Sequence, residues 1–298
     1  MLTGTALATF TLLWHAPGDP ALTIALARFQ AQVPDAVIEQ VRAEAGFDAG
    51  FWPAFLNWFG PLLRGDLGQS SVTGRDVWPD LLTAMFYTMP LALTALIIGI
   101  CAAIPLALLA TRHPGGWLDR FAIAIASVGA AIPQYWLGLL LILLFAVQLQ
   151  WLPAIGARTT AHLVLPALTL GLTVAASLTR IMRSGILEAR GQPFLPALER
   201  RGITQRGIGR DHIAPHAAIP VMTVLGLELA FLLEGAVLVE IIFARPGLGS
   251  FLVQAILTRD FPKVQAVVIV AALLFVIINL LIDLIYALLD PRIGETHA

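Results

Sequence analysis

Long apolar stretches recur along the chain at lengths that suit a membrane crossing. A helix that crosses the ~30 Å hydrocarbon core of a bilayer needs about 20 apolar residues. Its backbone polar groups must be paired within the helix, because lipid offers them no hydrogen bonds. The pattern predicts five transmembrane helices, at residues 84–110, 121–149, 163–179, 217–243 and 264–289.

The amino-terminal segment, residues 1–15, is apolar but short for a crossing. It shows neither the positively charged start nor the small-residue cleavage site of a signal peptide. We expect a first transmembrane span that is short or lacks upstream residues. The expected fold class is therefore an all-α polytopic membrane protein with six transmembrane helices.

Basic residues are concentrated on one side of these spans. If both termini are cytoplasmic, the short inner segments carry ten basic residues and the short outer segments carry four, which is the bias that marks the cytoplasmic side. The expected organisation is a first span at 1–15, an outer loop at 16–83, a transmembrane core at 84–293 with a cytoplasmic loop at 184–216, and a cytoplasmic tail at 294–298.

Short helices are expected in the outer segments. An amphipathic pattern starts at Pro34 and ends at Gly46, and a second runs over residues 51–63 with an aromatic side. Aromatic residues near a membrane end usually lie at the headgroup level, although a contact with substrate is the alternative. In the last outer loop, a Pro-Gly turn at Pro246 precedes a short helix at 250–257.

The cytoplasmic loop at 184–216 is basic and rich in proline and glycine. Between Pro196 and Gly202 there is room only for a short helix, residues 196–201, with a mixed apolar and charged surface. Such a helix suits a docking element. A solvated connector is the alternative, and composition does not separate the two.

Composition limits the functions that remain. The chain is 58% hydrophobic and 12% charged, whereas soluble domains average about 25% charged residues, so a soluble enzyme is not expected. The net charge of −1 gives no basic field for nucleic acid. Lys263 is the sole lysine and does not follow a glycine pair, so the chain has no phosphate-binding P-loop. The single cysteine, Cys101, supports neither a disulfide nor a metal cluster.

Four acidic residues fall inside predicted spans, where charge is costly and usually functional. Glu228, Glu234 and Glu240 are six residues apart. Six residues turn a helix by about 600°, so the three side chains point about 120° apart and cannot all face one passage unless the helix breaks, for example at Gly235. Asp283 is the fourth acidic residue.

Chemistry at membrane depth is not expected. His212 and His216 have an i,i+4 spacing that can bind metal, but no carboxylate follows at a suitable spacing, so we expect no metal site. We find no catalytic constellation and therefore expect a transport protein rather than an enzyme. An ion-coupled secondary transporter would show paired inverted halves, which the sequence does not.

Five short motifs, in register along the chain, resemble the membrane permease subunits of bacterial ABC importers for dipeptides, oligopeptides and nickel. The likeness runs from about Phe10 to Ile293, nearly the whole chain, and its strength lies in the combination. The motifs are Ala16-Pro17-Gly18-Asp19-Pro20, Arg64-Gly65-Asp66-Leu67-Gly68, Leu165-Pro166-Ala167-Leu168-Thr169-Leu170-Gly171, Arg245-Pro246-Gly247-Leu248-Gly249 and Leu289-Asp290-Pro291-Arg292.

The resemblance implies that the short cytoplasmic helix couples the chain to an ATPase. Gly202 and Pro220 match the family's coupling motif, but the helix carries larger, charged residues where the family usually has alanines. Salt bridges are therefore expected to form part of the contact. The expected coupling residues are Leu198, Glu199, Arg200, Arg201, Gly202, His212, Pro215 and Pro220.

The resemblance also implies partners. They are a second homologous permease subunit, two cytoplasmic ATPase subunits that bind ATP and Mg, and a periplasmic substrate-binding protein. No cofactor is expected on this chain, and its place is the bacterial inner membrane. The residues expected to face the binding protein are Asp66, Arg245, Pro246 and Gly247.

The substrate expected from the resemblance is a di- or oligopeptide, with nickel, glutathione or a metal chelate as alternatives. Relatives often carry acids at positions matching Glu240 and Asp283, which suggests a structural role for these two. Glu228 and Glu234 replace neutral residues and are the candidates for a feature particular to this transporter, where they would favour a cationic ligand. Protonated, hydrogen-bonded packing is the alternative.

Overall fold

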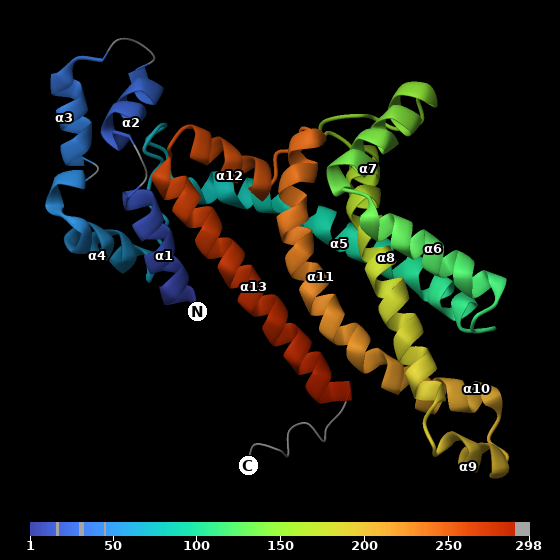
Figure 1. The fold of residues 1–298 in the computed structure, drawn as a ribbon. Helices are drawn as coiled ribbons and strands as arrows, with labels where there is room; N and C mark the ends of the chain where they lie inside the picture. The colour runs from blue at the N-terminus through green and yellow to red at the C-terminus, as the bar shows by residue number, and fades with distance from the viewer. Residues whose placement is uncertain (16–17, 30–32, 45, 290–298) are drawn as a thin grey trace, which may run out of the picture. The chain divides into compact units, whose positions relative to one another are not determined.

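The computed structural model describes residues 1–15, 18–29, 33–44 and 46–289, which fold into helices and connecting turns (Figure 1). The predicted tail at 294–298, the motif residues Asp290, Pro291 and Arg292, and Ala16 and Pro17 lie outside the described residues. The chain divides into two compact units. One comprises Met1–Thr88 and Pro246–Val276, and the other comprises Met89–Arg245 and the segment that begins at Ile277.

The first unit contains both outer helices predicted from the sequence. Two helices match the expected segments at 34–46 and 51–63, and the short helix predicted at 250–257 is also present. The elements of this unit are α1 (Leu2–Trp14), α2 (Pro20–Phe29), α3 (Asp35–Glu44), a 3-10 turn (Phe47–Ala49), α4 (Phe51–Leu62), the start of α5 (Val77–Ala110), α12 (Leu248–Leu257) and the start of α13 (Phe261–Leu289).

The helix α2 was not expected, although its start signal is visible. Asp19 accepts a hydrogen bond from the backbone N–H of Ala21 at 3.0 Å, and Pro20 supplies the fixed φ that suits a first helical position. Ala21 and Ile24 are fully buried and pack with Val41 of α3. The apolar residues of α2 therefore pack against α3 within the long outer loop.

The aromatic residues of α4 divide between packing and exposure. Phe55 is buried, and its ring lies 5.3 Å from that of Phe10 in α1, edge to face. Phe10 also stacks on Trp58 at 5.6 Å. Trp52 is exposed, so anchoring at the headgroup level stays a prediction for Trp52.

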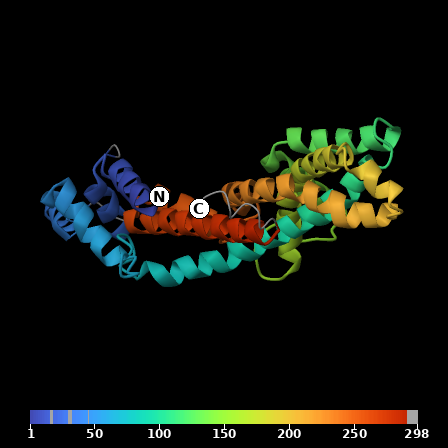
Figure 2. The same ribbon diagram turned by 90° about the horizontal axis from the view of Figure 1, so that it is seen from below.

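The second unit is built around two long helices that lie side by side, α8 and α11 (Figures 1 and 2). Gly171 lets α5 approach α8 closely, since a Cβ at this glycine would lie 2.8 Å from the carbonyl oxygen of Ala95. The elements are the rest of α5, α6 (Trp117–Ala131), α7 (Gln134–Leu141) with a π segment (Ile142–Gln148), α8 (Ala161–Arg190), α9 (Leu195–Arg200), α10 (Gln205–Ile208) with a π turn (Gly209–Ile213), α11 (Ala214–Ile242) and the end of α13.

The segment predicted as a span at 121–149 is two helices with a sharp bend between them, at one of the prolines that lie within predicted spans. The chain bends by 102° between α6 and α7. Ile132 is extended, with φ −76° and ψ 124°, because the ring of Pro133 disfavours the helical region for the residue before it. Pro133 then starts a new helix, so the segment is a broken span or a re-entrant loop.

Two helices extend beyond the spans predicted within them. The helix α5 begins at Val77, seven residues before the predicted span, and Asp80 in its first turn is paired with Lys263 at 3.3 Å. The helix α8 continues past Arg180 to Arg190, into the predicted cytoplasmic loop. Both spans were predicted to stop near a charged residue, Asp80 or Arg180, but in the structure each of these residues lies within its helix.

By length and composition, three of the described helices can each cross a bilayer, and the bent α6–α7 segment makes a possible fourth. The three are Val77–Ala110, Ala161–Arg190 and the first 24 residues of α13. The helix α11 has 29 residues and three glutamates, whereas α1 has 13 residues. The count of six spans stays a prediction.

Candidate functional site

The predicted coupling helix corresponds to α9, which ends at the glycine expected to end it. Gly202 has φ +77°, in the left-handed region that glycine adopts without strain. Its N–H donates to the carbonyl of Glu199 at 2.9 Å, and the N–H of Ile203 donates to that of Leu198 at 3.2 Å. This pair of bonds is the Schellman motif, which satisfies the last carbonyls of a helix.

The surface of α9 is polar and open. Glu199, Arg200 and Arg201 are exposed, and Leu198 is half-buried. Within the chain, Glu199 accepts a hydrogen bond from the amide of Gln205 at 2.6 Å. The arginines are thus accessible to another subunit, and their salt bridges to an ATPase stay a prediction.

Aromatic contacts fix the start of α9 against the start of α11. The ring of Phe194 lies 6.3 Å from His212 and 5.6 Å from His216. Nδ1 of His216 lies 3.0 Å from the carbonyl oxygen of His212, so the ring of His216 makes a hydrogen bond to the backbone one helical turn before it. Of the other expected coupling residues, Pro215 is exposed in the first turn of α11, and Pro220 packs against α8.

The three glutamates of α11 have different surroundings, as their angular separation requires. Glu240 is fully buried, and Glu228 is 9% exposed. The carboxylate of Glu228 bonds with the hydroxyl of Ser177 on α8, with Arg180 nearby on that helix. Glu234 is exposed, as is Asp283 on α13.

Glu234 lies within an otherwise apolar stripe. The exposed residues Leu227, Phe231, Leu238 and Ile241 recur with it at spacings of three and four along α11, which places all five on one helix face. A carboxylate on such a face needs a polar partner or an aqueous passage. Among the residues that the structure describes, none covers that face of α11.

The outer-face candidates also differ in accessibility. Asp66 is exposed, and its carboxylate accepts the N–H of Gly68 at 2.8 Å in the predicted turn. Pro246 is exposed, whereas Arg245 and Gly247 are buried within the chain. Asp66 and Pro246 are therefore the two that another protein can reach.

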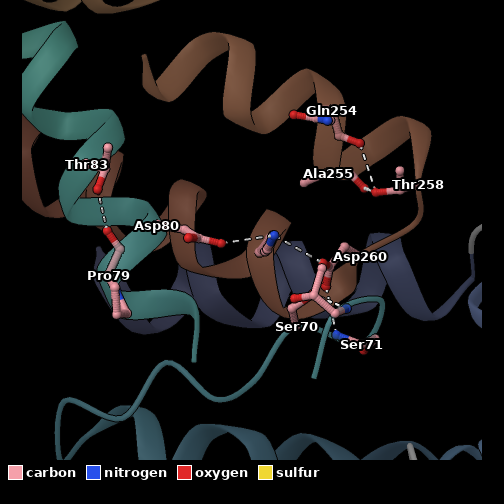
Figure 3. Close-up of polar contacts among 11 residues, drawn as sticks. Ser70, Ser71, Pro79, Asp80, Thr83, Gln254, Ala255, Thr258 and Asp260 are labelled. Carbon is pink, nitrogen blue, oxygen red and sulfur yellow. Dashed lines mark hydrogen bonds and ion pairs between the residues drawn. The ribbon is translucent and has the colours of Figure 1, made fainter. Parts of the chain in front are cut away.

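A polar network in the first unit was not anticipated from the sequence (Figure 3). Asp260, buried at the start of α13, accepts hydrogen bonds from the hydroxyl of Ser70 at 2.5 Å and the N–H of Ser71 at 3.0 Å. The ammonium of Lys263 lies 3.3 Å from Asp80 and 3.8 Å from Asp260. The network connects the turn before α5 to α5 and α13.

A cleft of about 430 Å³ lies beside this network, with Arg75, Gln254 and Thr258 in its wall. Bonded residues of the network are up to 190 positions apart in the sequence, so no local pattern predicts their contact. The one signal in the sequence is that Lys263, the sole lysine, stands three residues after Asp260.

Apolar side chains cover much of the helix surfaces and define the class of protein. On α5, Leu82, Phe86, Leu93 and Ile97 are all at least half exposed, which in water would be an aggregation hazard and in a bilayer is the lipid-facing side. The molecule is a polytopic helical membrane protein.

The chain belongs to the family of binding-protein-dependent transport system inner membrane components, whose model matches residues 96–295. It is an ABC importer permease subunit, as the sequence motifs indicated. Family members of this kind work with an ATPase and a binding protein.

Curated relatives support this assignment over nearly the whole chain. The chain is 35% identical over 284 residues to the glutathione transport system permease protein GsiC of Escherichia coli O6:H1, covering 95% of this chain and 92% of that one. The protein of the same name from Shigella dysenteriae serotype 1 is 34% identical over the same length.

Solved structures share the fold. The inward-facing MetNI methionine ABC transporter matches with a TM-score of 0.59 and 20% identity, covering 70% of this chain and 96% of that chain. An amino acid ABC transporter matches with a TM-score of 0.52 and 21% identity, covering 70% and 92%. At these identities the likeness concerns the fold alone.

Proposed function

We propose that this permease subunit imports a small peptide that a periplasmic binding protein delivers. The observation that carries the proposal is the 35% identity, over 95% of the chain, to a permease protein of a glutathione transport system. Glutathione, which stood among the alternatives to a di- or oligopeptide, is itself a tripeptide. It is also a convenient probe.

The acidic residues of α11 support a ligand with a cationic group. Every peptide with a free amino terminus carries an ammonium, including peptides whose net charge is negative. Glu234, on the exposed face of α11, is the better candidate to meet it, because Glu228 is already bonded to Ser177 of the same chain. Glu240 is fully buried and takes a structural role in this proposal, and Asp283, exposed on α13, remains a second pathway candidate.

The driving force comes from outside the chain. ATP and Mg bind to two cytoplasmic ATPase subunits, and α9 with Gly202 receives their movement. A second permease subunit completes the passage by covering the open face of α11. The ligand shifts the equilibrium between outward and inward states only through its different affinity for the two. Both termini lie in the cytoplasm, in accordance with the arginine bias.

Uptake by the purified complex tests this proposal. The complex is isolated through a tag on this chain, reconstituted in proteoliposomes and supplied with its binding protein. We expect uptake of labelled glutathione or a labelled dipeptide that requires ATP inside the vesicles. ATP-dependent uptake of nickel, with no uptake of either peptide, would contradict the substrate class. Uptake driven by an ion gradient without ATP would contradict the mechanism.

A further inference from the structure

Two arginines of α8 hold the turn that joins α5 to α6. Nε of Arg183 donates to Oδ1 of Asp119 at 2.5 Å, and Nη2 donates to Oδ2 at 2.7 Å. Arg190 donates to the carbonyl oxygen of Thr111. The two arginines are seven residues apart, which places them on one face of α8, about 10 Å apart along its axis.

The contact is built for a fixed geometry. Asp119 is 2% exposed and accepts a third hydrogen bond, from the N–H of Gly115 at 2.7 Å. Gly115 has φ +77°, which glycine adopts without strain, so the turn is shaped to aim this N–H at the carboxylate. A bidentate arginine–carboxylate pair fixes direction as well as distance.

Both contacts also agree with the helix dipoles. Thr111 follows the last residue of α5, where a carbonyl carries partial negative charge and a cation is favourable. Asp119 is in the first turn of α6, where a carboxylate is favourable. The two arginines of α8 thus bind the end of α5 and the beginning of α6.

The part of α8 that carries these two arginines is followed directly by α9. The helix ends at Arg190 and α9 begins at Leu195, and the N–H of Gly191 donates to the carbonyl of Leu187 at 3.1 Å between them. On another face of α8, Gly185 allows close packing with α11, since a Cβ there would lie 3.2 Å from Pro220. The end of α8 is therefore attached to α5 and α6, to α11 and, through a short turn, to α9.

We propose that Arg183, Arg190 and Asp119 form a clamp that makes α5 and α6 follow the movement of α9. They are positioning residues, since they act through the helices and not on the solute. The inference rests on the proposed function, because it concerns how ATPase movement reaches the passage. A contact that only stabilised the fold would change the amount of complex and leave the solute imported per ATP unchanged.

The first test separates these roles with Asp119→Asn, Arg183→Lys and the exchange Asp119→Arg with Arg183→Asp. The control is Arg112→Ala, an exposed residue of the same turn. The amount of assembled complex, its ATPase activity and its ATP-dependent uptake of glutathione or a dipeptide are measured in proteoliposomes.

We expect each single variant to lower uptake per ATP hydrolysed by about tenfold, within the usual range of coupling between sites. The exchange variant should recover part of the lost uptake per ATP, and the control should show the same uptake per ATP as the wild type. Uptake per ATP at the wild-type level in both single variants would overturn the clamp.

The second test does not depend on the substrate. Spin labels are placed at the exposed positions Ala197→Cys on α9 and Arg120→Cys on α6, after Cys101→Ser. We expect the distance between the labels to stay the same with and without an ATP analogue, and to change on nucleotide binding once Asp119→Asn is added. A distance that changes in the chain with an intact clamp would overturn the inference. If the wild-type complex takes up neither peptide, the proposed substrate class fails, and this measurement still decides the clamp.

Discussion

At the scale of single residues, Gly202 illustrates how one backbone conformation defines the end of α9, the proposed coupling helix. Its left-handed φ lets two N–H groups bond to the last carbonyls of α9, and the exposed side chains of Glu199, Arg200 and Arg201 are displayed just before it. A residue with a Cβ pays about 1–2 kcal/mol in this conformation. The cost falls on a helix of only six residues.

Gly202→Ala is therefore expected to fray the end of α9 and to weaken transport, while the transmembrane helices stay intact. ATP-dependent uptake at equal amounts of membrane-inserted protein measures the effect. Gly209→Ala is the matched control, since Gly209 lies nearby with a helical φ of −61° and has open space at its Cβ position. Equal uptake by the two variants would show that the shape of the α9 end is unimportant.

The acidic residues of α11 give a second prediction at this scale. Glu234→Gln is expected to change which peptides are taken up, because its exposed carboxylate is the candidate for the ligand ammonium. Glu228→Gln should have a smaller effect on preference, since glutamine can still bond to Ser177. Uptake of a set of dipeptides with free and acetylated amino termini measures preference. An unchanged preference in both variants would remove their proposed role.

At the scale of elements, the network around Lys263 shows how distant segments of the first unit are connected. Asp260, directly before α13, bonds to the turn at Ser70, and Lys263 of α13 joins it to Asp80 of α5. The side chain of Lys263 is 14% exposed and lies over the ring of Phe251 at 5.3 Å. Its removal leaves the buried carboxylate of Asp260 without its cation.

Lys263→Met should therefore destabilise the first unit by about 1–3 kcal/mol, the usual cost of removing one partner from a buried polar group. The apparent melting temperature in detergent is the measurement. Arg75→Met is the control, because Arg75 is an exposed residue in the wall of the same cleft. A melting temperature that falls equally in both variants would contradict a specific role for the network.

The element scale also shows what the sequence could predict. Hydropathy located α5, α8, α11 and α13, and breakers located α3, α9 and α12, because those signals are local. Hydropathy did not show that α5 begins before its span and that α8 continues after its span, since Asp80 and Arg183 lie in these extensions and are paired with residues 183 and 64 positions away. Pro133 marks the position of the bend in the sequence, but the apolar residues on both sides of it do not show that the chain turns by 102° there.

At the scale of the whole molecule, the chain is a permease subunit with uncovered apolar faces and no P-loop in its sequence. Its motif-level resemblance predicted the family that residues 96–295 match. For the candidate coupling and passage sites, the sequence predicted individual residues but not which of them lie in contact. Contacts such as Arg183 with Asp119 require the folded chain, because helix packing and not sequence spacing brings them together.

The most direct test of the proposed coupling replaces residues 196–202 with a glycine–serine stretch of equal length and measures ATP hydrolysis and peptide uptake together in proteoliposomes. We expect the variant to insert in the membrane, uptake to be lost and hydrolysis to stop responding to the binding protein. Peptide uptake that remained coupled to ATP hydrolysis in this variant would contradict the claim that movement enters the permease through α9.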